Sequence, residues 1–335
     1  MNWRNRYTRL IKFEFWPTWF FYAPFIFQWL FYSLKSRSLS YFMQANPGMR
    51  FGGLFQYSKF AILRQVSPAY RPKSVFFEEL PADPNFYQTD FEYPFICKPD
   101  IGERGKAVTL IRNEQDWQDL LPQMHQPFIL QEYVDFNTEL GVLYYRFPNG
   151  GSGISSIVSK GFLTMVGDGR HTLNELVAQH VRAANRSEFF AKKFAQVWDE
   201  VLPKGQALVL EEIGNHCRGT TFYNANHLIN EQLVQVFDEI AQPLQGFYYG
   251  RFDLRVKSLE DLYNGKNIRV VEVNGVNSEA AHIYDPHYSL FTAYRDVAHN
   301  LRIVYKIAKQ LKGKSKAISY RALASAAKKH FLSRA

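Results

Sequence analysis

Two pairs of polar residues interrupt apolar stretches late in the chain, and their spacing suits metal chemistry. Glu272 and Asn274 lie in VVEVNG, and Arg251 and Asp253 lie in GRFDLRV. Side chains alternate between the faces of a strand, so each pair points to one side. If the two stretches pair, Asp253, Glu272 and Asn274 converge, and three oxygen donors suit Mg²⁺. The alternative for VVEVNG is an edge strand whose polar face meets water.

A phosphate-binding element is predicted upstream of these strands. Lys98 ends the apolar stretch YPFICKP, and a loop with Gly102 and Gly105 follows it. Glycines let backbone N–H groups approach phosphate oxygens, and Lys98 would add a positive point charge. Arg251, beside the metal donors, can hold negative charge that develops on a phosphate or a tetrahedral oxyanion.

Two acidic residues bracket the turn that follows the next apolar stretch, PFILQEYV. Glu132 and Glu139 lie on either side of a turn, where their carboxylates can accept hydrogen bonds from ribose hydroxyls or an adenine amino group. Taken singly, each of these residues is more often a surface charge. The order of the parts favours a nucleotide site: a lysine–glycine loop, two hinge acids, Arg-x-Asp, then Glu-x-Asn.

This order resembles the ATP-grasp superfamily of carboxylate–amine ligases, in particular its D-alanine–D-alanine ligase branch, over roughly residues 54–290. ICKPDIGERGKAV is similar to that branch's phosphate-binding segment, and SKFAIL lies where those ligases carry an earlier lysine. LQEYVDFNTELGV is similar to their hinge, and GRFDLRV and VVEVNGVNS are similar to their metal-site strands. The resemblance implies ATP and Mg²⁺ as cofactors, with Arg251 stabilising the tetrahedral intermediate and Asp253, Glu272 and Asn274 holding the metal. The residues implied to bind ATP are Lys59, Lys98, Gly102, Arg104, Gly105, Glu132, Glu139 and Lys160.

Other segments are more similar to cyanophycin synthetases and related amide ligases. These are GDGRHTLNELV and GNHCRGTTFYNANHLIN. By that comparison Arg218 lies in a loop near the phosphates or the acceptor, and Lys160 in SIVSKGF reaches the same pocket. Asn277, Ser278 and Glu279 directly follow the metal strand and are the remaining substrate candidates.

Two features depart from the ligase pattern. D-alanine ligases begin with a Rossmann-like domain that helps to bind the first substrate, whereas this chain begins with an aromatic segment, which argues against D-alanine as the substrate. The glycine loop carries Arg104 where a serine is common, which implies ionic as well as backbone contacts to phosphate.

The composition and the order of elements predict an α+β fold. The 335 residues, 46% hydrophobic, are enough for two units with proper cores. Hairpin-like strand pairs dominate over βαβ units, which favours α+β lobes over a doubly wound sheet. We therefore expect an ATP-grasp fold, in which two α+β lobes clasp the nucleotide. The two cysteines, Cys97 and Cys217, form neither a disulfide framework nor a metal-site spacing.

Residues 15–34 form an uncharged segment in which eleven of twenty residues are aromatic. A helix of this length can cross ~30 Å of hydrocarbon, but Trp and Tyr prefer the headgroup interface and Pro17 and Pro24 break or kink a helix. A re-entrant or in-plane segment at the cytoplasmic face of the cell membrane fits these features best. A single-span anchor and a hydrophobic element docked on the catalytic core or on a dimer partner are the alternatives.

Positive charge is concentrated at the two ends of a chain whose formal net charge is +9. Residues 306–335 contain nine Lys/Arg and no acid, which suits anionic lipid or a solvated tail. No stacking platform or nucleic-acid motif accompanies these charges, so nucleic acid is not expected as a partner. The expected organisation is a basic and aromatic membrane segment (1–50), a helix with a Pro-rich connection (51–90), a nucleotide lobe (91–145), a catalytic and metal lobe (146–305) and a basic tail (306–335).

These features together predict an ATP-dependent ligase that joins a carboxylate to an amine through an acyl phosphate at the membrane surface. The substrates are expected to be small or lipid-like, and a homodimer remains an alternative assembly. The alternative function is a nucleotide-binding scaffold of the same fold without ligase activity, because the first-substrate domain is missing.

Overall fold

A four-stranded antiparallel sheet forms the centre of the first lobe. The computed structural model describes residues 3–83, 85–102, 105–212, 214–313 and 320–332. The strand order is β1-β4-β2-β3, and Trp117 of α5 is fully buried against Phe95 of β2. The bounds are β1 Ser74–Phe77, β2 Phe95–Pro99, β3 Thr109–Ile111, β4 Phe128–Glu132 and α5 Glu114–Leu120.

A five-stranded antiparallel sheet forms the second lobe, with the order β11-β10-β5-β6-β9. β5 and β6 form the hairpin predicted around the turn NGGSG. The pairs between neighbouring strands are antiparallel in both sheets, in agreement with the expected mixed fold. The bounds are β5 Thr138–Arg146, β6 Ser152–Gly161, β9 Thr221–Asn224, β10 Tyr249–Val256 and β11 Ile268–Asn274.

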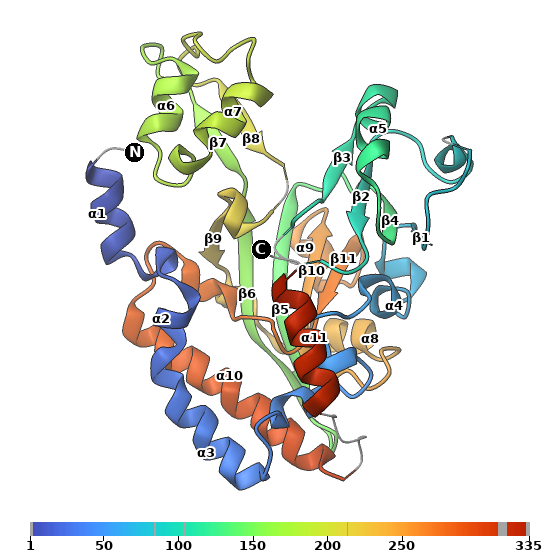
Figure 1. The fold of residues 1–335 in the computed structure, drawn as a ribbon. Coiled ribbons are helices and arrows are strands. Elements are labelled where there is room, and N and C mark those ends of the chain that lie inside the picture. The colour runs from blue at the N-terminus through green and yellow to red at the C-terminus, as the bar shows by residue number, and fades with distance from the viewer. Residues whose placement is uncertain (1–2, 84, 103–104, 213, 314–319, 333–335) are drawn as a thin grey trace.

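Helices cover both faces of the large sheet (Figure 1). Val142 packs into the core beneath α8, whereas its neighbour Leu143 packs into the core beneath α10, because successive side chains of β5 point to opposite faces. The apolar face of α8 follows a helical period and includes Leu233, Phe237 and Ile240. The bounds are α8 Glu231–Ala241, α9 Leu259–Tyr263 and α10 Leu290–Leu311.

A small subdomain projects from the large sheet and faces the first lobe across the molecule (Figure 1). It contains the pair β7–β8 and the helices α6 and α7. Thr172 caps α6 in a capping box with Glu175, as its position before LNELV predicts. The bounds are β7 Leu163–Val166, β8 Ala207–Glu211, α6 Leu173–Gln179 and α7 Ser187–Lys193.

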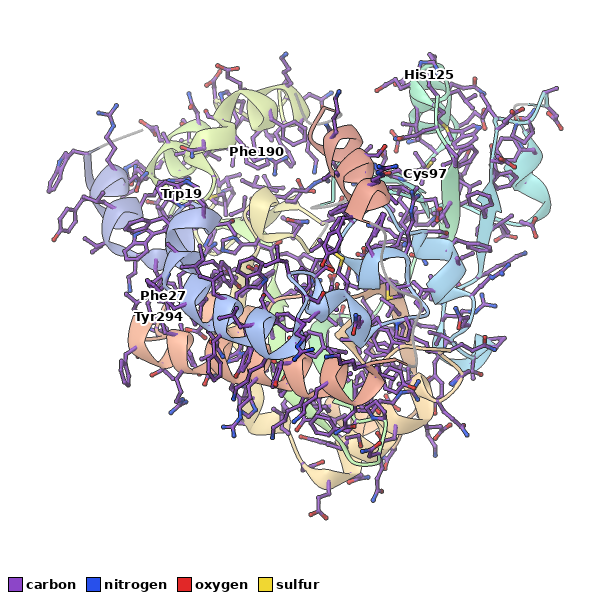
Figure 2. All side chains as sticks on the ribbon, turned by 60° about the horizontal axis from the view of Figure 1, so that its bottom comes forward. Trp19, Phe27, Cys97, His125, Phe190 and Tyr294 are labelled. Atoms are coloured by element: carbon purple, nitrogen blue, oxygen red, sulfur yellow. The ribbon has the colours of Figure 1, made fainter. Side chains whose placement is uncertain are left out.

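The aromatic N-terminal segment forms short helices that pack along α10. The ring of Phe21 contacts that of Tyr294 at 5.2 Å, and Tyr32 stacks on Tyr305 at 4.2 Å. Figure 2 shows Phe27 and Tyr294 on the same side of the molecule as Trp19. Among the described residues, no helix has the length and apolar character needed to span a bilayer. The bounds are α1 Trp3–Ile11, α2 Thr18–Tyr22, α3 Ile26–Ser36, α4 Lys59–Leu63 and α11 Tyr320–Leu332.

Two segment boundaries differ from the expected organisation. Residues 306–311, expected to begin the basic tail, form the last part of α10. Ile307 is fully buried in the core between α10 and the large sheet. The apolar period of α10 continues through these residues even though the charge pattern changes there. Residues 74–77, expected in a Pro-rich connection, form β1 and belong to the first lobe.

Candidate active site

A cavity of about 860 Å³ lies between the two lobes and the small subdomain. Its walls contain nearly all of the residues predicted to bind nucleotide, metal or substrate. Arg218 does not line the cavity, and Arg104 lies outside the described residues. The predicted residues that line it are Lys59, Lys98, Gly102, Gly105, Glu132, Glu139, Lys160, Arg251, Asp253, Glu272, Asn274, Asn277, Ser278 and Glu279.

The two metal-site stretches pair as β10 and β11, as predicted. Asp253 lies directly opposite Glu272, and Arg251 lies opposite Asn274. The four side chains therefore share one face of the sheet, and the amide Nδ2 of Asn274 donates to Oδ2 of Asp253 at 2.9 Å. A bulge between Asp253 and Leu254 shifts the register between the two strands immediately beyond this group.

Gly141 of β5 makes room for these side chains on the sheet surface. It pairs with Asp253 on the neighbouring strand. A Cβ at this position would lie 2.9 Å from Cγ1 of Val158, 3.2 Å from Cδ of Arg251 and 3.2 Å from Oδ1 of Asp253. The missing side chain lets Arg251 and Asp253 lie flat across β5.

Asp253 is held between two cations. Nη2 of Arg251 lies 3.1 Å from Oδ2 of Asp253, and Nζ of Lys160 lies 3.0 Å from Oδ1. Burial alone would raise the pKa of Asp253, but Arg251 and Lys160 outweigh it and hold that pKa well below its usual range. Burial lowers the pKa of Lys160, and Asp253 and Glu139 more than reverse this, so that its pKa is raised. Both groups are therefore charged at neutral pH.

Glu272 pairs with Lys59, which the start of α4 positions. Nζ of Lys59 lies 2.6 Å from Oε1 of Glu272. Burial raises the pKa of Glu272, but the charges of Lys59 and Lys98 and the hydrogen bond from Lys59 together outweigh it, so that this pKa is lowered. Asp100 fixes the helix start, because its Oδ1 accepts from the hydroxyl of Ser58 and from the N–H of Phe60, both at 2.9 Å. The loop after β2 thus orients the lysine on α4.

Lys98 is a buried cation in the cavity wall whose hydrogen bonds go to neutral groups. Its ammonium donates to Oε1 of Gln131 at 2.8 Å and to the carbonyl of Val271 at 3.0 Å, both neutral groups. Burial lowers the pKa of Lys98 to about 8, although the charge of Glu272 acts in the opposite direction. A buried ammonium held by neutral acceptors is well suited to take an anionic partner such as a phosphate.

The two predicted hinge acids have different surroundings. Glu139 is buried, and its oxygens contact Lys160 at 2.8 Å and Nε of Arg255 at 3.3 Å. Glu132 is exposed, and its Oε2 accepts from the backbone N–H of Lys73 at 3.0 Å. Both line the cavity, but Glu139 is part of the charged network and Glu132 lies at the edge.

Arg218 ties the small subdomain to the glycine loop of the first lobe. Its Nη2 donates to the carbonyls of Gly105 at 2.6 Å and of Val108 at 3.2 Å. Gly105 has φ +68°, and a Cβ there would lie 3.0 Å from Nδ2 of Asn215, so the close approach depends on glycine. Arg218 therefore binds the glycine loop and is not among the residues that line the cavity.

The loop after β11, which holds the substrate candidates Asn277, Ser278 and Glu279, lines one end of the cavity. The hydroxyl of Ser278 accepts from the N–H of Arg251 at 3.2 Å, and Glu279 accepts from the hydroxyl of Tyr284 at 3.1 Å. The amide oxygen of Asn277 is buried and finds no hydrogen-bond partner among the described residues. An acceptor buried in this way in a cavity wall is suited to a donor group of a ligand.

The donor set at β10 and β11 fits a magnesium ion. No group of three His, Cys, Asp or Glu side chains within the described ranges is close enough to hold a metal. The predicted set has two carboxylates and one amide, and Mg²⁺ commonly takes one or two carboxylates and completes its coordination with water and phosphate. Oδ1 of Asn274 accepts from the hydroxyl of Tyr57 at 2.9 Å, so that amide is already oriented by the protein.

The sequence-based prediction missed several charged residues of the cavity wall. Arg255 lies two residues after Asp253 on the same strand, and the spacing Arg251, Asp253, Arg255 was the available signal. Glu14 and Arg182 form an ion pair in which both side chains are nearly buried. Their meeting is a tertiary contact between segments far apart in the sequence, and no local pattern indicates it.

No family model matches the sequence, and no curated protein matches it. Among solved structures, D-alanine–D-alanine ligase from Bacillus anthracis complexed with ATP has a TM-score of 0.44 and 14% identity, covering 76% of this chain and 66% of that one. The RimK domain protein ATP-grasp from Sphaerobacter thermophilus has a TM-score of 0.39 and 11% identity, with 75% and 67% covered.

A bifunctional glutathione synthetase from Pasteurella multocida also matches, with a TM-score of 0.38 and 15% identity over 74% of this chain. The chain spans only 38% of that protein and 66% of the Bacillus anthracis ligase. Segments similar to cyanophycin synthetases do not appear among these matches, and that comparison stays a prediction.

Proposed function

We propose that the protein is an ATP-dependent ligase that joins a carboxylate to an amine. The observation that supports this most strongly is the convergence of Lys59, Lys98 and Lys160, from both lobes, on the opposed carboxylates Asp253 and Glu272 in one cavity. Positive groups that surround a metal-type donor set are suited to a polyphosphate and its divalent ion.

In this proposal each part of the wall has a separate task. Lys59 and Lys98 hold the phosphates of ATP, and Glu139 accepts from the ribose. Asp253, Glu272 and Asn274 would hold Mg²⁺, which would supply positive charge to neutralise the transferred phosphoryl group. Lys160 and Arg251 keep Asp253 ionised, and the guanidinium of Arg251 faces the oxygen on which negative charge develops.

The reaction has two steps. An oxygen of the substrate carboxylate attacks the γ-phosphorus, the bond to the β-phosphate oxygen breaks, and ADP leaves. The amine nitrogen then attacks the acyl carbon, phosphate leaves, and the nitrogen loses a proton. Arg251 stabilises the tetrahedral oxyanion between addition and departure. No covalent enzyme intermediate is required.

The test is ADP release by the full chain, purified in detergent, with pooled acids and amines and with the product read by mass. We expect ADP release that requires both an acid and an amine. Asp253→Ala should abolish it, and Asp261→Ala, an acid in the first turn of α9, is the matched control. Full turnover in Asp253→Ala would refute the metal assignment. ATP binding without turnover across the panel would instead indicate a nucleotide-binding scaffold.

We further propose that the protein works at an anionic membrane surface on the cytoplasmic side. Support comes from the N-terminal helices, where Phe27 and Leu34 are 77% and 79% exposed. Lys35, which lies over the ring of Phe31 at 4.3 Å, and Arg37 place positive charge beside them. Aromatic and basic side chains together are typical of helices that lie in the headgroup region.

A further inference from the structure

The N-terminal segment contributes a wall of the catalytic cavity as well as an outer surface. Phe13, Glu14 and Phe21 line the cavity and have little exposure. The carboxylate of Glu14 pairs with Arg182 of the small subdomain, and His216 lies 3.8 Å from the same carboxylate. This segment is therefore an integral part of the substrate end of the cavity.

An aromatic series joins that wall to the outside of the molecule. Trp16 lines the cavity, and its ring lies 5.0 Å from that of Phe20, which is 48% exposed. Phe20 in turn lies 5.7 Å from Trp19, which is 73% exposed. We call Trp16, Phe20 and Trp19 the aromatic series. The three rings follow one another from the cavity wall to the exposed surface.

The surface at the outer end of the series is unusually apolar. About half of the exposed large hydrophobic side chains in the described residues belong to the first 34 positions. Glu14 is the single acid among residues 3–40, and it is held in its ion pair. The exposed charges of this segment are therefore basic, and the surface complements anionic lipid.

The inner end of the series meets groups that accept hydrogen bonds. Glu279 lies beside Tyr22 and Tyr284, and burial together with the Glu279 charge raises the pKa of Tyr22 well above its usual range. Asn277, whose amide oxygen has no hydrogen-bond partner among the described residues, lines the same cavity. A carboxylate and a buried amide oxygen next to Arg251 suit the ammonium or amino group of an acceptor substrate.

We infer that the acceptor substrate is an amphiphilic primary amine, with its amino group at Glu279 and Asn277 and its apolar chain along the aromatic series. The same segment would take the amine from the lipid surface and close the cavity behind it. This inference rests on the proposed ligase function, and it names the class of the amine.

The test compares straight-chain primary amines from ethylamine to dodecylamine, with a pooled acid mixture and the full chain. Each CH₂ that reaches the aromatic series should raise kcat/KM by about fourfold. The double variant Trp19→Ser/Phe20→Ser should remove this dependence on chain length. Leu259→Ser, which changes an exposed leucine of α9, should retain it.

Binding of dodecylamine by equilibrium dialysis gives a second readout that needs no turnover. Binding that weakens at least tenfold in the Trp19→Ser/Phe20→Ser variant supports the inference even if no acid yields ADP, in which case only the ligase function fails. ADP release that is equal for ethylamine and dodecylamine overturns the inference and leaves the ligase function intact. If the double variant abolishes self-association while the chain-length dependence is unchanged, a second copy covers this surface and the inference is wrong.

Discussion

Replacing Lys98 with methionine tests the electrostatics of the cavity directly. The pKa of Lys98 in the folded protein is about 8, against an ordinary value of 10.5. Between these pH values the unfolded chain binds a proton that the folded chain does not, so this lysine makes stability rise with pH. The difference corresponds to about 3 kcal/mol, at about 1.4 kcal/mol for each pH unit.

Lys98→Met removes that burial cost but takes the ammonium donor from Oε1 of Gln131 and leaves the carbonyl of Val271 with the longer contact from Nε2 of Gln131 at 3.4 Å, which costs about 1–3 kcal/mol. The two effects nearly cancel at pH 7, so the free energy of unfolding of the variant should lie within about 2 kcal/mol of the wild-type value at that pH. From pH 8 to pH 10.5 the free energy of unfolding of the wild type rises, and that of the variant does not. The variant should therefore lose about 3 kcal/mol relative to the wild type across this range.

Urea unfolding at pH 7, 8, 9 and 10, followed by the same fluorescence signal for each protein, measures this difference. Lys106→Met removes an exposed lysine from the adjacent loop and is the matched control, with a difference that should stay constant. ATP affinity at pH 7 should fall about 10–100-fold in Lys98→Met, because a charge-assisted contact to phosphate contributes about 1.5–3 kcal/mol. A stability difference that does not vary with pH would refute the assigned environment of Lys98.

Three further predictions concern packing, the N-terminal ion pair and the outer surface. Gly141→Ala should lower ADP release at least tenfold with an unchanged circular dichroism spectrum, because the added methyl group displaces the side chains on β10; full activity would contradict this. Glu14→Gln should destabilise the protein by about 3–5 kcal/mol, since it leaves Arg182 buried and unpaired, and Glu14→Gln/Arg182→Met should recover part of the loss in thermal unfolding. Phe27→Glu/Leu34→Glu should reduce co-sedimentation with vesicles of 30% phosphatidylglycerol about tenfold or more while ATP binding persists; undiminished sedimentation would argue against this surface.

The strands and the metal-type face could be predicted because their signals are local. Alternation places Arg251 with Asp253 and Glu272 with Asn274, and the apolar residues between them require a buried sheet. Pairing then brings the groups together with no further information. The capping box at Thr172 is equally local, because it depends on one residue three positions later.

The substrate end of the cavity could not be predicted in this way. Its wall combines residues near position 15 with residues near positions 182 and 280, and tertiary packing alone decides which segments meet. The aromatic composition of residues 15–34 indicated an apolar environment without distinguishing lipid from protein. In the structure Phe21 and Tyr32 contact α10, whereas Trp19 and Phe27 remain exposed. The interpretation of a hydrophobic element docked on the catalytic core describes the part that contacts α10, and a membrane contact of the exposed rings stays a prediction.

The contact of Arg218 with Gly105 and Val108 has a kinetic consequence for nucleotide exchange. One guanidinium spans two units that lie on opposite sides of the cavity, and it also reaches Glu211 at 3.4 Å. In the proposed ligase, an opening of the cavity between the glycine loop and Arg218 would have to separate these partners. Breaking the contacts of Arg218 would then limit the rate of turnover. Weakening these contacts would speed the release of ADP and leave the rate of the chemical steps unchanged.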